Sequence, residues 1–110
     1  MKIIFAIILS ILSIQAYAAT TPDGQKIKKI WSWGDYTDGV ILIQLESTLS
    51  QCPNGFWFKD SEGAGSKNLL SVALSAFHAQ APVTIYANES SDWGGLSTKE
   101  CEIKLIVMGS

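Results

Sequence analysis

Two cysteines behind an N-terminal export segment constrain the fold of this 110-residue chain most strongly. Residues 1–18 combine an early lysine, an apolar run, and Ala16 and Ala18 at the positions that precede a signal-peptidase cut. The apolar run is too short to span a bilayer, and no second run follows it. We therefore predict a signal peptide over 1–18 and a secreted or periplasmic chain without a membrane span. In that oxidising location Cys52 and Cys101 are expected to form a structural disulfide.

Charge and aromatic content narrow the classes of partner. The chain has no arginine and a formal net charge of −2 at pH 7, which argues against nucleic-acid binding because phosphate neutralisation depends on clustered basic side chains. Four tryptophans are a high load for one domain of about 90 residues. Such residues either fill a small core or form a binding surface. Core packing is the default expectation for Trp31 and Trp33, which share one face of a regular strand.

Hydrophobic periodicity predicts five strands and one helix. Residues 19–25 are polar, contain a turn, and are expected to form a loose arm. The helix is expected over Lys67–Gln80, with Ser66 placed to cap the first turn. One buried stripe of this helix is expected to contain the residues at helical spacing, Leu70, Ala73, Leu74 and Phe77. The expected strands are Lys26–Trp33, Val40–Leu45, Gly55–Lys59, Val83–Tyr86 and Glu102–Met108.

The resulting order is β-β-β-α-β-β, an α+β arrangement that is mainly β. This is the order of the OB-fold, a small five-stranded Greek-key barrel, although other small α+β sheets also fit it. We predict one OB-like domain over 19–110. Ligands of OB-folds lie on the face of strands two and three, between two loops that correspond here to 34–39 and 88–100. Those loops carry Tyr36 and Trp93, and Trp33 lies beside the first of them.

Two short blocks resemble a known family. The block Asp38–Leu45 and the helix-to-strand run from Leu74 to Tyr86 resemble the B subunit of subtilase cytotoxin and its pertussis-like relatives. The resemblance implies an OB-fold subunit that forms a homopentameric ring and binds cell-surface glycans for an exported enzymatic A subunit. It fits equally well a family of small exported bacterial proteins that share the fold without a toxin partner.

One residue departs from the toxin pattern. In the subtilase-type subunit a serine just before the Gly-Val of the second strand helps to hold sialic acid, and this chain has Asp38 there. A carboxylate that faces a carboxylated sugar is repulsive unless another group neutralises it. Sialic acid recognition by that route is therefore not expected.

The sequence offers no catalytic or metal-binding motif. His78 is the only histidine and lies on the expected helix, and there is no Gly-x-Ser-x-Gly nucleophile elbow. One histidine and two paired cysteines do not supply a zinc site. We predict a protein that is not an enzyme and that has no metal and no cofactor.

The function favoured by these observations is that of an exported, non-catalytic binding domain with a glycan as ligand. The candidate ligand-binding residues are Trp33, Tyr36, Asp38 and Trp93, because sugar rings stack on aromatic planes while polar groups read their hydroxyls. The alternative is a periplasmic structural or protein-interaction module without a sugar ligand. An exposed apolar strand edge or helix face without a sugar-sized cleft would favour that alternative.

Overall fold

The computed structural model describes residues 18–34, 39–59 and 62–109. Apart from Ala18, the predicted signal peptide lies outside this part of the chain. No helix of the described residues is long and apolar enough to cross a membrane. The elements are β1 (Ala18–Thr20), β2 (Ile27–Ser32), β3 (Val40–Leu45), β4 (Phe56–Lys59), α2 (Ala64–Ala79), β5 (Val83–Asn88) and β6 (Cys101–Met108).

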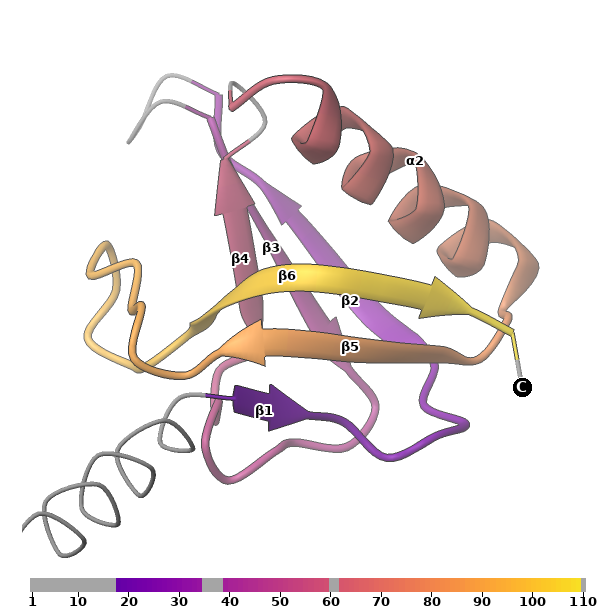
Figure 1. The fold of residues 1–110 in the computed structure, drawn as a ribbon, viewed down its shortest axis with the longest axis horizontal. Coiled ribbons are helices and arrows are strands. Elements are labelled where there is room, and N and C mark those ends of the chain that lie inside the picture. The colour runs from indigo at the N-terminus through magenta and orange to yellow at the C-terminus, as the bar shows by residue number, and fades with distance from the viewer. Residues whose placement is uncertain (1–17, 35–38, 60–61, 110) are drawn as a thin grey trace, which may run out of the picture.

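The strands form one open six-stranded sheet rather than the expected five-stranded barrel. Its order is β1-β5-β6-β4-β3-β2, with β4 and β6 parallel and every other neighbouring pair antiparallel. The sheet bends so strongly that β5 and β6 cross the direction of β2, β3 and β4 (Figure 1). An isolated bridge joins the segment between β1 and β2 to β5, where the Val83 N–H donates to the Gln25 carbonyl at 2.7 Å.

The additional strand corrects the expectation of a loose N-terminal arm. Ala18–Thr20 pairs with β5, and Ala19 is almost fully buried at 1% exposure. Thr21 extends this pairing, because its hydroxyl accepts the Ile85 N–H at 2.9 Å while its own N–H donates to the Ile85 carbonyl. The segment is polar and short, so its pairing with a distant strand leaves no local periodic signal in the sequence.

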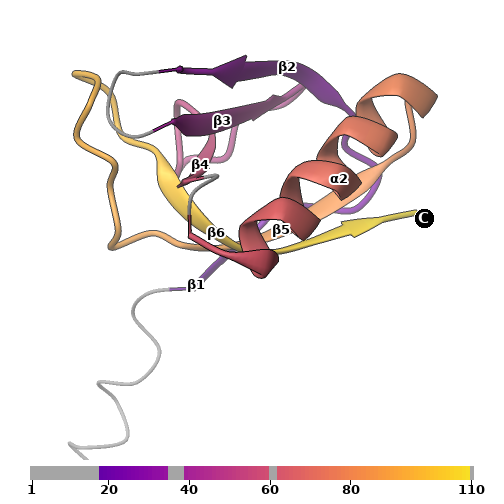
Figure 2. The ribbon, with the colours of Figure 1, turned by 90° about the horizontal axis from the view of Figure 1, so that it is seen from above.

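The helix covers the inner face of the sheet. Figure 2 shows α2 lying between β2 and the arm formed by β5 and β6. Ala73 and Ala76 are fully buried in the main core, and their small side chains let the helix approach β6 and β2 closely. Leu74, which the helical spacing placed in the buried stripe, is 41% exposed instead.

The ends of α2 also differ from the prediction. The helix begins at Ala64 with Gly63 as the N-cap residue, and no side chain caps it. Ser66 is buried inside the first turn and does not act as the cap. At the other end Gln80 adopts the left-handed conformation, and its N–H donates back to the carbonyls of Ala76 and Phe77, which closes the last turn.

Alternation along β3 and β4 divides their side chains between two apolar clusters. Ile41 and Ile43 of β3, with Phe56 and Phe58 of β4, belong to the main core under α2. Val40, Leu42 and Trp57 point to the opposite face and form a second buried cluster there. Because both faces of β3 are covered, its sequence reads as a continuous apolar run.

The predicted disulfide is present. Cys52 and Cys101 are bonded, with their Cα atoms 5.4 Å apart, and both are buried. The bond ties the connection between β3 and β4 to the first residue of β6.

Replacing both cysteines by alanine should lower the free energy of unfolding by about 4 kcal/mol. The reason is that the bond joins two residues 49 positions apart and so restricts the conformations of the unfolded chain. Urea denaturation of the oxidised wild type and of the Cys52→Ala/Cys101→Ala variant measures the difference. A loss below about 1 kcal/mol would show that the bond contributes little to the fold.

Candidate functional site

The structure brings together two of the four candidate residues. The rings of Trp33 and Trp93 have centroids 4.8 Å apart and planes tilted by 57°. Both indoles pack on the second apolar cluster of Val40, Leu42 and Trp57. Tyr36 and Asp38 lie outside the described residues.

Trp31 joins this pair and was not among the candidates. Trp31 and Trp33 stand on the same side of β2, and their rings stack with centroids 5.7 Å apart and planes 13° from parallel. Trp31 is 43% exposed, so the expectation of core packing is wrong for this residue. The reason is that α2 covers the opposite face of the sheet, towards which Ile27 and Ile30 point. Trp31, Trp33 and Trp93 together are called the tryptophan platform below.

A β-bulge interrupts the regular alternation of side chains along β2. Ile27 pairs with Leu45 and Lys29 with Gln44, so the register shifts at Lys28. The extra residue puts Ile27 and Ile30 on the inner face although they are three positions apart. The uneven alternation of the sequence in this strand was the available signal of the bulge.

Two polar groups, the Lys29 ammonium and the Gln44 amide, border the indole of Trp31. The Lys29 ammonium lies 5.9 Å from the Trp31 ring centroid, near the outer limit of a cation–π contact. The Trp31 Nε1–H donates to Gln44 Oε1 at 2.8 Å, which fixes the orientation of an otherwise exposed ring.

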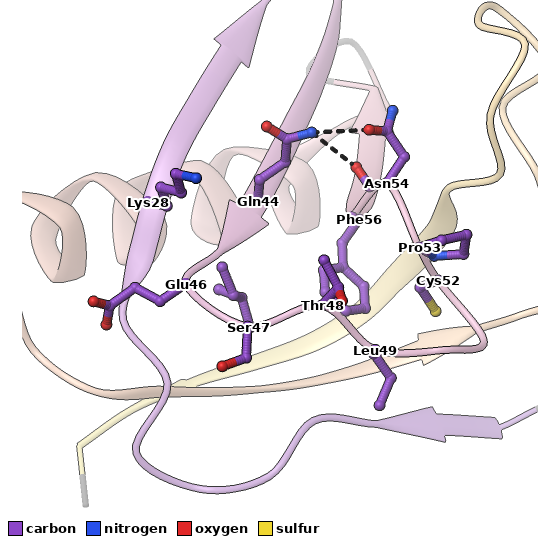
Figure 3. A pocket seen from close by; sticks show the side chains of 12 residues that line it. Lys28, Gln44, Glu46, Ser47, Thr48, Leu49, Cys52, Pro53, Asn54 and Phe56 are labelled. Carbon is purple, nitrogen blue, oxygen red and sulfur yellow. Dashed lines mark hydrogen bonds between the residues drawn. The ribbon is translucent and has the colours of Figure 1, made fainter.

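Gln44 begins a chain of side-chain hydrogen bonds that ends at a buried carboxylate. Its Nε2 donates to the Asn54 carbonyl at 3.1 Å and to Asn54 Oδ1 at 3.0 Å (Figure 3). Asn54 Nδ2 then donates to Glu100 Oε2 at 2.8 Å, and the Thr98 hydroxyl donates to the same oxygen at 2.9 Å. Glu100 is fully buried, and its Oε1 has no hydrogen-bond partner within the described residues. Trp31, Gln44, Asn54 and Glu100 are called the polar chain below.

The loop that carries Trp93 is held from several sides. Asp92 Oδ1 accepts the Glu100 N–H at 3.0 Å, so this carboxylate has a structural partner. The Trp57 Nε1–H donates to the Ser91 carbonyl at 2.9 Å. Gly95 lies directly against the Trp93 ring, where an added Cβ would come within 2.4 Å of the indole. The loop therefore presents Trp93 in one position against Trp33.

The one histidine of the sequence lies apart from the platform. His78 is exposed on α2, edge-on to Phe77, and so belongs to the helix on the other side of the sheet. Within residues 18–34, 39–59 and 62–109 no group of three or more His, Cys, Asp or Glu side chains is placed to hold a metal ion. The site consists of stacked indoles, an amide, an amine and a buried carboxylate, a set suited to binding.

Comparisons with known proteins add no relative. No protein-family model, no curated protein and no solved structure matches this chain.

Gly95→Ala should move the Trp93 indole away from Trp33, because the new methyl group would overlap the ring. Near-ultraviolet circular dichroism, which reports on the fixed environment of indoles, should lose part of its tryptophan signal. Gly34→Ala is the matched control, since a Cβ there meets no heavy atom within 4 Å. An unchanged Gly95→Ala spectrum would contradict the placement of Trp93.

Proposed function

We propose that this protein is an exported, non-catalytic domain that binds carbohydrate on the outer face of β2 and β3. The observation that carries the proposal is the tryptophan platform, in which Trp31 is 43% exposed yet held by Trp33 and Gln44. Sugar rings present C–H faces that pack on aromatic planes, and a nearby amide can exchange hydrogen bonds with their hydroxyls. Lys29 lies only loosely over the Trp31 ring, so a ligand can displace it.

Preorganisation supports a binding role for the platform. A side chain that is immobilised before the ligand arrives loses less conformational entropy when the complex forms. Trp31 is oriented by one hydrogen bond and one stacked neighbour, and Trp33 is backed by the Trp93 ring. The platform therefore needs little rearrangement to accept a flat apolar surface.

Charge and composition favour a sugar over other ligands of aromatic surfaces. Single-stranded nucleic acid also stacks on aromatic side chains, but its binding relies on a positively charged groove. This chain carries a formal net charge of −2 and no arginine. A ligand rich in hydroxyls and without a high charge fits the platform and its amide border better.

A glycan array with wild type, Trp31→Ala and Tyr86→Ala tests the proposal. Trp31→Ala should lower the affinity for any bound glycan about tenfold, because the stacking surface is lost. Tyr86→Ala is the matched control, since Tyr86 is an aromatic residue of similar exposure, 45%, on β5. Absence of glycan binding by folded wild type, or equal losses in both variants, would contradict the proposal.

A second candidate function is protein interaction through the outer side of β5 and β6. Tyr86, Leu105 and Val107 are each between 44% and 47% exposed, and register pairs Tyr86 with Leu105. Exposed apolar patches of this kind commonly mark interaction surfaces. This observation favours the accessory module as the alternative. The homopentamer and the exported A subunit that the toxin resemblance implies stay predictions from the sequence.

A further inference from the structure

A hollow of about 220 Å³ lies at the end of β3, where Gln44 and Lys28, on the side of the tryptophan platform, meet the core residues Leu45, Cys52 and Phe56. It opens between the end of β3 and the connection that leads to Cys52, with α2 behind the sheet (Figure 3). Gln44, Asn54, Ser47 and Thr48 contribute polar groups to its lining, and Leu49 contributes an apolar one. The volume is that of several water molecules and admits a small ring.

Gln44 connects the hollow to the platform. Its Oε1 accepts the Trp31 indole N–H, while its Nε2 donates to the Asn54 carbonyl and side chain in the wall of the hollow. The Gln44 side chain thus contacts both the tryptophan platform and the wall of the hollow. From Trp33, the residue after β2, to Lys29 the face runs along four residue steps, or roughly 13 Å at the rise of a β-strand, and Lys28 follows as the extra residue of the bulge. That length exceeds a single sugar ring.

The β-bulge adds Lys28 to this face. The register pairs Lys29 with Gln44 and leaves Lys28 as the extra residue of the bulge, and Figure 3 shows the Lys28 side chain directed towards Gln44. Glu46 also borders the hollow, and neither Lys28 nor Glu46 forms an ion pair within the described residues. One amine and one carboxylate leave the hollow without a net charge. A neutral ligand rich in hydroxyls matches both groups.

We propose that the hollow is a second subsite, so that the protein binds a neutral oligosaccharide of two or more linked sugars. One ring stacks on Trp31, and a neighbouring ring occupies the hollow, where Thr48, Ser47 and Lys28 contact its hydroxyls. This inference rests on the proposed function and adds the size and charge class of its ligand. Lengthening the sugar chain therefore strengthens binding until both subsites are filled.

The test is an array of neutral length series, from mono- to hexasaccharides of β-1,4-glucose, β-1,4-N-acetylglucosamine and mannose. Affinities of the bound series are then measured by titration of the tryptophan fluorescence. Thr48→Phe places a ring in the hollow, while Ser50→Phe adds the same bulk to an exposed residue of the same connection outside the lining. Thermal unfolding of both variants verifies that each is folded.

The wild type should bind an oligosaccharide at least tenfold more tightly than its monosaccharide, an increment of about 1.4 kcal/mol. Thr48→Phe should remove that tenfold gain and leave monosaccharide binding unchanged, and Ser50→Phe should keep the gain. Monosaccharides that bind as tightly as their oligomers, or a gain that survives Thr48→Phe, would overturn the second subsite while leaving the proposed function intact. Absence of binding to every sugar would overturn both.

Discussion

The packing of α2 on the inner face of the bent sheet determines the rest of the structure. Ala73 and Ala76 are fully buried, α2 packs chiefly on β6 and β2, and the side of β3 that carries Ile41 and Ile43 belongs to the same core. The side chains of β2, β3 and β4 that point away from α2 lie on the other face of the sheet. Trp33 and Trp93 pack there on the second apolar cluster of Val40, Leu42 and Trp57, and Trp31 stacks on Trp33.

The polar chain holds this outer face in register with the loop before β6. Asn54 follows the disulfide-bonded Cys52 in the chain, and Glu100 precedes Cys101, so the covalent bond and the hydrogen bonds connect the same two segments. A buried carboxylate is costly unless donors surround it, and Asn54 and Thr98 supply two of them. The orientation of Trp31 at the surface thus depends on a group buried beside the disulfide.

Local patterns predicted local structure well. The bounds of Val40–Leu45 and the alternation of Phe56, Trp57 and Phe58 agree with the structure, because burial on both faces leaves a direct mark on the sequence. The disulfide was predicted from the cysteine number and from the expectation of export. Features that depend on distant partners were missed: β1 pairs with β5 across the chain, and the exposure of Trp31 follows from the position of a helix more than thirty residues away. No sequence pattern connects Gln44, Asn54 and Glu100, because only the fold brings them within hydrogen-bond distance.

The central claim is that β2 presents its tryptophans on the outer face of the sheet. Hydroxyl-radical footprinting of the native protein, read tryptophan by tryptophan by mass spectrometry, tests it most directly. Trp31, which is 43% exposed, should be oxidised fastest, the half-buried Trp33 and Trp93 more slowly, and Trp57, at 7% exposure, slowest. Protection of Trp31 equal to that of Trp57 would place it in the core and contradict the account.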